Sequence, residues 1–190
     1  MKEINENENF NINNHKDMFQ DMLKAEELCY EYNNMPASDI DKRNEHLRKM
    51  LGKVDGDFLI FSPFKCALGY NIELGSNVAM NSYCCILDGG KVKFGNDIWV
   101  GPNCEIISSG HSVDPVRRKT GYGYANPILI ENNVYIGSRV TIVCSEKKGI
   151  TIGENSVIGS GTVVTKDVPK NVLVAGNPCK IIRKLSESEK

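Results

Sequence analysis

This sequence has little net charge and no long apolar run. Its 190 residues carry a formal net charge of −1, so no bulk electrostatic field favours nucleic acid or an anionic membrane as a partner. No apolar stretch approaches the roughly 20 residues that span a bilayer. The N-terminus is polar and rich in asparagine, without the apolar core of a signal peptide. We therefore expect neither a nucleic-acid nor a membrane partner.

Paired cysteines are also lacking. The seven cysteines form no CxxC pair, and their number is odd. Without a secretion signal, this pattern indicates reduced thiols in a cytoplasmic protein. Cys84 and Cys104 each follow a regularly spaced apolar residue by four positions, which favours a packing role for both.

Several catalytic motifs are missing as well. The sequence has no Walker A loop and no GxGxxG motif, so nucleotide hydrolysis and hydride transfer have no support. It has three histidines, His15, His46 and His111. A catalytic zinc site needs three protein ligands, so we expect no metal site. His15 and His46 are interpreted as ordinary solvated residues.

The first third of the chain divides into a tail and a helical segment. Residues 1–16 are polar and are expected to be a disordered tail. Residues 17–56 show apolar residues at helical spacing in two stretches, separated by Asn33, Asn34 and Pro36. This pattern predicts a helical hairpin that is too small to bury a core of its own and must pack on the rest of the chain.

A six-residue period runs through the rest of the chain, predicted as one β domain over residues 57–185. Neither a helix nor an ordinary strand has this period, whereas a parallel β-helix does. Three repeats of this period would make one coil of about 18 residues, such as Leu68 to Ile86. We call the apolar residue that recurs every six positions the beat residue. Glycine and Asn or Asp after a beat residue suit the corners between strands. The apolar beat residues are Leu68, Leu74, Met80, Ile86, Phe94, Val100, Ile106, Ile130, Ile136, Ile142, Ile152, Ile158 and Val164.

Three breaks interrupt this period. Two extra residues fall near Asp88, and four extra fall in the polar stretch 145–148, for which the sequence offers no role. The third break is an excursion loop, residues 107–127. Loops longer than about 12–15 residues are usually functional. This one contains His111, which could act as a general base because imidazole titrates near neutral pH. A loop histidine with a structural hydrogen bond is the alternative.

Six stretches together resemble the maltose/galactoside O-acetyltransferase family, the sugar branch of the hexapeptide-repeat acyltransferases. The resemblance covers roughly residues 24–185 and includes the helical hairpin, which distinguishes this branch. The histidine loop and the Thr-Lys-Asp to Asn-Pro ending are its most specific parts. The stretches are 64–72, 81–88, 110–114, 133–137, 163–167 and 176–178.

The resemblance implies a mainly β fold, a left-handed parallel β-helix with an N-terminal helical hairpin. It also implies a homotrimer with sites between subunits, acetyl-CoA as donor and a small hydroxylated acceptor. His111 would be the catalytic base, and Asn81 would stabilise the oxyanion, for which an amide donor is suited. Acceptor contacts would involve Asn81, Ala67, Gly89 and Tyr83. Contacts to acetyl-CoA would involve Gly101, Ser138, Ser160, Thr165, Lys166, Lys180 and Arg183.

The acceptor side departs from the family pattern. Ala67 stands where Asp or Ser is usual, and Gly89 where a carboxylate is expected. The nearest match to an expected N-terminal acidic residue is Asn13, and Tyr135 replaces a more usual Trp. Lys180 replaces Arg and loses the bidentate fork. The leading hypothesis is therefore a sugar O-acetyltransferase. The alternatives are an acetyltransferase for an antibiotic or cell-envelope glycan and a catalytically inactive CoA-binding trimeric scaffold.

Overall fold

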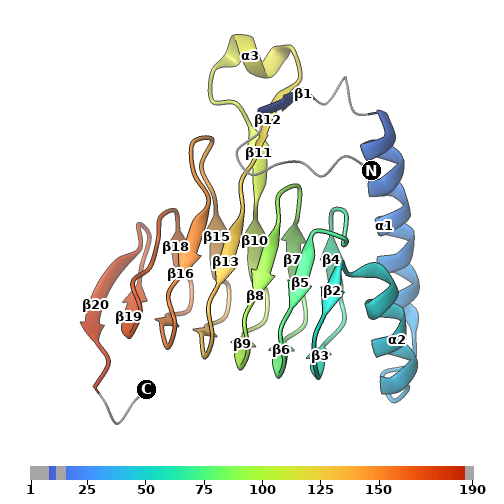
Figure 1. Cartoon of the computed structure of the whole chain (residues 1–190), viewed down its shortest axis with the longest axis horizontal. Helices are drawn as coiled ribbons and strands as arrows, with labels where there is room; N and C mark the ends of the chain where they lie inside the picture. Colours follow the sequence, from blue (N-terminus) through green and yellow to red (C-terminus); the bar gives the residue numbers. More distant parts are fainter. Residues whose placement is uncertain (1–8, 12–15, 187–190) are drawn as a thin grey trace.

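The chain forms a parallel β-helix with two helices packed at its N-terminal end. The computed structural model describes residues 9–11 and 16–186. Figure 1 shows α1 and α2 beside the first coil and β20 at the opposite end. Three sheets form the three faces of the solenoid. The predicted fold class, mainly β with a parallel β-helix after a helical segment, is confirmed.

The chain visits the three sheets in turn, and within them only β20 runs antiparallel to its neighbour. Sheet I contains β2 (Lys53–Val54), β5 (Ile72–Leu74), β8 (Val92–Phe94), β13 (Ile128–Ile130) and β16 (Ile150–Ile152). Sheet II contains β3 (Phe58–Ile60), β6 (Val78–Met80), β9 (Ile98–Val100), β14 (Tyr135–Ile136), β17 (Val157–Ile158), β19 (Val172–Ala175) and β20 (Lys180–Lys184). Sheet III contains β4 (Phe64–Cys66), β7 (Cys84–Leu87), β10 (Glu105–Ile107), β15 (Thr141–Val143) and β18 (Val163–Val164).

The beat residues line the interior, as the period of six predicts. Their exposed fractions run from 0% for Ile136 to 5% for Leu68. Strands β3 to β10 and β13 to β19 each contribute one or two buried side chains, because side chains alternate across a strand, whereas β20 is exposed throughout. The resulting core is one continuous cluster that also includes the buried faces of α1 and α2.

The predicted coil from Leu68 to Ile86 is wrong by two residues. Ile86 lies opposite Cys66 in β4 and opposite Ile106 in β10, so these coils have 20 residues. Leu68 is buried, but it belongs to a corner rather than to a strand. The period of six cannot distinguish the two registers because Cys66 and Leu68 are both apolar.

All the breaks in the period lie at the same corner of the solenoid, where sheet III leads into sheet I. The steps across the other two corners stay at six residues, as from Met80 to Ile86 and from Phe94 to Val100. The extra residues follow β4, β7, β10 and β15, which are consecutive strands of sheet III. The breaks therefore stack along one edge, the III–I corner, which is at the top of Figure 1.

The corner between sheets I and II carries a ladder of residues in the left-handed conformation. Their φ angles are 54–59° at Asn77, Asp97, Asn133, Asn155 and Asn171. The prediction that Gly and the Asn or Asp next to it suit the corners, where φ can be positive, is confirmed for Asn and Asp, whereas Gly75 and Gly95 do not have positive φ. Glycine is needed for close approach instead: a Cβ on Gly75 would lie 2.5 Å from the carbonyl oxygen of Gly95 in the next coil.

The N-terminal helices α1 (Lys16–Asn34) and α2 (Ile40–Met50) cover the open end of the core. The Tyr32 hydroxyl donates to the carbonyl of Ile60, and Leu47 is fully buried. His46 is not the solvated residue expected from the sequence. Its side chain is 11% exposed, and its Nε2 lies 2.8 Å from the carbonyl oxygen of Leu28.

The excursion 107–127 is a folded unit rather than an open loop. It contains β11 (Ser109–His111), α3 (Pro115–Lys119) and β12 (Tyr122–Ala125). β11 and β12 pair antiparallel, and β1 (Asn9–Asn11) adds to β12. The predicted disordered tail is therefore wrong for residues 9–11. The remainder of that tail except Lys16, including Asn13 and His15, lies outside the described residues.

All seven cysteines are unpaired, and six of them are buried. Within the described part of the chain, no helix has the length and apolarity needed to cross a membrane. A cytoplasmic location stays a prediction.

The side chain of Asn33 closes the free edge of sheet III at β4. The N–H of Phe64 donates to Asn33 Oδ1 (2.8 Å), and Asn33 Nδ2 donates to the carbonyl of Phe64 (2.9 Å). We expect Asn33→Ala to lower the free energy of unfolding by about 1–3 kcal/mol, because two backbone groups lose their partners. Denaturant unfolding at one fixed protein concentration measures this change. Asn34→Ala is the control, since Asn34 is exposed and bonds only within its own helix; an equal loss in both variants would contradict the role of Asn33.

Candidate active site

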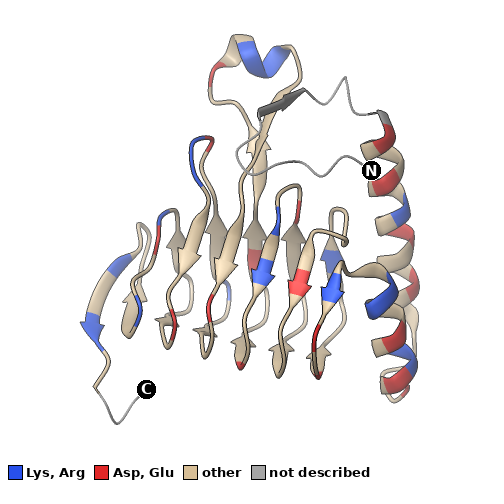
Figure 2. Cartoon of the chain, in the orientation of Figure 1, with Lys and Arg blue, Asp and Glu red and all other residues tan. Residues whose placement is uncertain are grey.

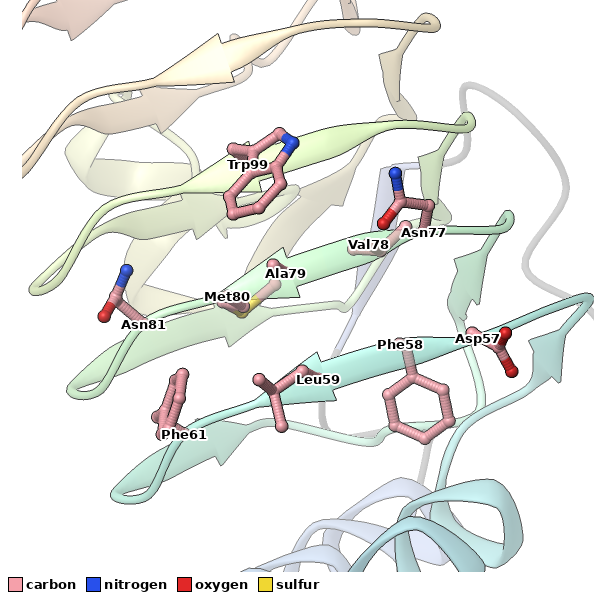
Figure 3. Close-up of a pocket in the computed structure, with 10 residues that line it drawn as sticks. All are labelled: Asp57, Phe58, Leu59, Phe61, Asn77, Val78, Ala79, Met80, Asn81 and Trp99. Atoms are coloured by element: carbon pink, nitrogen blue, oxygen red, sulfur yellow. The ribbon is translucent and has the colours of Figure 1, made fainter. Parts of the chain in front are cut away.

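A hollow of about 330 Å³ lies on the outer face of sheet II. In the cross-strand ladder of this face, Ala79 stands between Leu59 and Trp99. The small side chain of Ala79 leaves space that the larger neighbours border. Figure 3 shows Asn81 and Phe61 at the end of the hollow where the strands leave the sheet. The hollow is thus mainly apolar, with an amide at that end, a combination typical of small-molecule sites.

Asn81 is the first of a column of predicted site residues along the corner between sheets II and III. Its N–H donates to Val100 O (2.9 Å) in the next coil, and the N–H of Gly101 donates to Ile136 O (2.7 Å) in the one after. The N–H of Ser138 donates to Ser160 Oγ (3.1 Å). The stacking of coils therefore brings together four residues that are 79 positions apart from first to last in the sequence.

The column requires glycine at position 101. A Cβ there would lie 2.7 Å from the backbone nitrogen of Ser138, closer than real side chains allow. Gly161, next to Ser160, has a φ of 73° and open space where a side chain would be. This edge therefore presents backbone groups and small side chains that a ligand can approach closely.

Tyr83 lies two residues after Asn81 at the same corner. Its φ is 63°, and its side chain is 64% exposed. Asn103, at the equivalent place in the next coil, also has positive φ. A non-glycine aromatic residue in this conformation is strained, and such strain is concentrated at functional sites.

The predicted cationic residues lie at the C-terminal end of the solenoid. Thr165 and Lys166 follow β18, while Lys180 and Arg183 lie on β20. Lys166 and Lys180 line a common hollow of about 410 Å³. Figure 2 shows the basic stretches of β20 at this end. Exposed ammonium groups beside a hollow are suited to binding phosphate.

His111 lies at a different corner from this column, in the excursion that leaves the solenoid at the III–I corner. It is the last residue of β11, is exposed, and pairs in register with Gly123 of β12. α3 follows it, capped by the Asp114 carboxylate, which accepts from the N–H of Val116 (2.8 Å). The guanidinium of Arg117 stacks on Tyr122 at 4.5 Å from the ring centre. These contacts make the histidine loop a small ordered unit.

Ala67 and Gly89 lie on the III–I corner, in the two coils that precede this loop. The buried Asp88 carboxylate accepts there from the N–H groups of Ala67 (3.0 Å) and Leu68 (2.8 Å) through Oδ1. Its Oδ2 is buried with no hydrogen-bond partner among the described residues. Burial raises the pKa of Asp88, against the lowering effect of the backbone N–H groups. A side chain on Gly89 would collide with Ser109.

The predicted site residues thus fall into separate groups on one chain. Asn81, Tyr83, Gly101, Ser138 and Ser160 follow the II–III corner. His111, Ala67 and Gly89 belong to the III–I corner, and sheet III lies between the two corners. The described residues include no group of three or more His, Cys, Asp or Glu side chains arranged to hold a metal ion.

Sequence reasoning missed Trp99, Phe61 and Glu146. Trp99 is 57% exposed and borders the hollow beside Asn81. Its position immediately before the beat residue Val100 was a usable signal, because neighbours of an inward residue in a strand point outward. Nothing local in the sequence points to the contacts of Glu146, which depend on the stacking of the coils.

A hexapeptide-period solenoid with a helical cap and a polar column at one corner defines a hexapeptide-repeat protein of the acyltransferase class. Residues 7–56 match the maltose acetyltransferase hexapeptide capping motif, and residues 127–166 match the hexapeptide repeat of succinyl-transferase. The galactoside O-acetyltransferase of Escherichia coli strain K12 is 39% identical over 168 residues, which are 88% of this chain and 81% of that protein.

Solved structures agree with these matches. A maltose O-acetyltransferase from Clostridium difficile 630 superimposes with a TM-score of 0.88 at 34% identity, over 95% of this chain and 94% of that one. A galactoside acetyltransferase in complex with coenzyme A gives 0.85 at 36% identity, over 92% and 85%. The chain belongs to the maltose/galactoside O-acetyltransferase family.

The buried Asp88 carboxyl should make the folded state less stable as pH rises. Its pKa is raised on folding, so this carboxyl keeps its proton to higher pH in the folded protein than in the unfolded chain, and its contribution to the free energy of unfolding falls as pH rises above about 4. Asp88→Asn keeps the Oδ1 acceptor and removes the charge. The melting temperature of this variant, relative to that of the wild type, should therefore rise as the pH is raised from about 4 to neutrality.

Asp167→Asn is the control of opposite sign. A hydrogen bond from Lys148 lowers the pKa of Asp167, so that carboxylate contributes stability above about pH 4 that is lost as pH falls. Its variant should lose melting temperature relative to the wild type at neutral pH. A difference in melting temperature between the wild type and Asp88→Asn that does not change with pH would refute the assignment of a raised pKa to Asp88.

Proposed function

We propose that this protein is an acetyl-CoA-dependent O-acetyltransferase that acts on a hydroxyl group of a sugar or similar small acceptor. Membership of the family and the coenzyme A in a related structure support the donor. The observation that carries the proposal is the column of Asn81, Gly101, Ser138 and Ser160 beside an apolar hollow. It combines an amide donor for an oxyanion with a close-approach surface for a cofactor.

The reaction follows from the chemistry of the two groups. His111 takes the proton of the acceptor hydroxyl as that oxygen attacks the thioester carbonyl carbon. The Asn81 amide donates to the oxygen that becomes negative. The carbon–sulfur bond then breaks, and the CoA thiolate takes the proton from the His111 imidazolium. The products are an acetyl ester and free CoA thiol.

The cofactor would lie along the II–III corner. Gly101, Ser138 and Ser160 would contact it through backbone and hydroxyl groups. Lys166, Lys180 and Arg183 at the C-terminal end would pair with its phosphates, with Thr165 next to them. These roles, like those of His111 and Asn81, are part of the proposal.

A homotrimer with sites between subunits would complete this arrangement. On one chain, His111 and Asn81 belong to different corners with sheet III between them. A second copy could bring its His111 loop against the hollow beside Asn81. Closed symmetric assembly would then give every subunit both halves of a site.

The acceptor need not be a simple maltoside or galactoside. Ala67 and Gly89 present no side-chain oxygen, and a side chain at position 89 would collide with Ser109. This observation favours a second candidate, acetyl transfer to a different acceptor such as an antibiotic or a cell-envelope glycan. A panel of glycosides, aminoglycosides and glycan fragments, followed by CoA thiol release, distinguishes the two. Coenzyme A binding without turnover on any acceptor would instead indicate an inactive scaffold.

Replacing the base should abolish most turnover. We expect His111→Ala to lower kcat by roughly 10²–10⁴-fold, the usual contribution of a general base. Thiol release from acetyl-CoA with the best acceptor of the panel measures it. Val116→Ala is the control, because this side chain is 72% exposed in the same loop. Undiminished turnover in His111→Ala would remove this residue from the mechanism.

Mixed assemblies test whether the site is shared. His111→Ala and Asn81→Ala chains are co-expressed with different tags, and the mixed oligomers are purified through both tags. If each site takes His111 and Asn81 from neighbouring chains of a trimer, each mixed trimer has one of its three sites intact, so the purified mixed oligomers should regain about one third of the wild-type activity. Mixed oligomers as inactive as either parent would show that one chain supplies both residues.

A further inference from the structure

The turn at residues 145–148 lies directly against the histidine loop. It connects β15 to β16, the neighbours of β10 and β13 between which the loop leaves the solenoid. The N–H of Ser145 donates to the Lys148 carbonyl (3.0 Å), and Ser145 Oγ accepts from the N–H groups of Lys147 (3.3 Å) and Lys148 (3.1 Å). Lys148 pairs with Asp167. The turn is therefore held in a defined shape from both sides.

Glu146, at the tip of this turn, binds the segment that follows His111. Its Oε1 accepts from Ser112 Oγ (3.0 Å) and from Arg117 Nη1 (3.1 Å). Its Oε2 accepts from the N–H of Val113 (3.4 Å). The Glu146 side chain is only 19% exposed. One carboxylate thus holds a hydroxyl, a backbone amide and a guanidinium of the loop.

Ser112 transmits this anchorage to its neighbour His111. Ser112 is 2% exposed, and its N–H donates to Tyr122 O (3.3 Å) across the loop. Arg118 Nη1 donates to the Ser112 carbonyl (3.1 Å). With the hydroxyl on Glu146, the backbone and side chain of Ser112 are all fixed, which leaves His111 little freedom except rotation of its own side chain.

The far end of the loop is attached to the same turn. Asn126 is 3% exposed, and its Nδ2 donates to the Ser145 carbonyl (2.8 Å). Its own N–H donates to Ser108 O (2.8 Å) at the start of the loop. The segment after His111 and the last residues of the excursion are therefore both attached to residues 145 and 146, which belong to the next coil.

We propose that Glu146 is a positioning residue for His111, and that the 145–148 insertion serves to hold the catalytic loop. This inference rests on the proposed function, in which His111 is the base. Holding a base in place contributes to rate because a displacement of about 1 Å can cost roughly 10²-fold. A general contribution to stability is a weaker explanation, since Arg117 is 42% exposed and pairs of that kind stabilise little.

Glu146→Ala should lower kcat by roughly 10- to 100-fold while KM for acetyl-CoA stays near the wild-type value. The residues proposed to bind the cofactor lie on other elements, so only the base is displaced. Glu146→Gln keeps an acceptor oxygen for Ser112 and should recover part of the rate. Lys147→Ala is the matched control, because its exposed side chain lies in the same turn and its backbone N–H, which the substitution keeps, donates to Ser145 Oγ within that turn.

The same substitution in the His111→Ala background separates positioning from folding. If Glu146 acts through His111, removing it causes no further loss once the base is absent. A further loss of the full size would show that Glu146 acts independently of His111 and would overturn the inference.

Hydrogen exchange of the peptide 108–125 provides a readout that needs no activity. Exchange should be faster in Glu146→Ala than in the wild type and unchanged in Lys147→Ala. Unchanged exchange in Glu146→Ala, or faster exchange with normal kcat, would overturn the positioning role but leave the proposed function intact. Full activity of His111→Ala would instead overturn the proposed function, whatever the exchange shows.

Discussion

Every coil of this protein must match its neighbours residue for residue, because parallel backbone hydrogen bonds join them on all three faces. The inward apolar residues stack in the same register, so an extra residue within a strand would turn the core face outward. Extra residues can leave the solenoid only at a corner. In this chain they leave at a single one, after β4, β7, β10 and β15. The III–I corner is therefore where the fold tolerates variation.

The regular corners, with steps of six residues, and the irregular III–I corner present different kinds of surface. The regular corners stack identical steps of six residues, so small residues and backbone groups from distant parts of the chain align, as Asn81, Gly101, Ser138 and Ser160 do. Such an edge suits an extended ligand such as a cofactor. The irregular corner can build a compact unit of its own, and it holds His111 on a paired strand beside a capped helix. Regular and irregular edges lie on opposite sides of sheet III, and for this reason we propose that a second copy completes the site.

The insertion at 145–148 shows how the solenoid supports its own irregular part. A loop that leaves between β10 and β13 is held partly by β1, which pairs with β12, and partly by residues of the adjacent coils. On one side the backbone of Leu87 and Gly90 binds Ser108 at the start of the loop, and on the other Glu146 binds the segment after His111. Asp88 remains buried with an unsatisfied oxygen. The III–I corner thus combines costly buried polarity with the residues proposed for chemistry, a pattern common at functional sites.

The sequence alone determined the inward-facing residues, the helical cap and the place of the histidine loop, because hydrophobic period and helix-ending residues are local signals. It did not determine the length of a coil, since Cys66 and Leu68 satisfy the same pattern, and cross-coil hydrogen bonds select Cys66. It also did not show that residues 9–11 pair with β12 or that His46 is covered. Glu146 and Ser112 are 34 positions apart, and Asn81 and Ser160 are 79 apart. Only the stacking of coils brings such residues together. Which residues face each other across two coils depends on how many residues each corner contains, because that number sets the register between the coils.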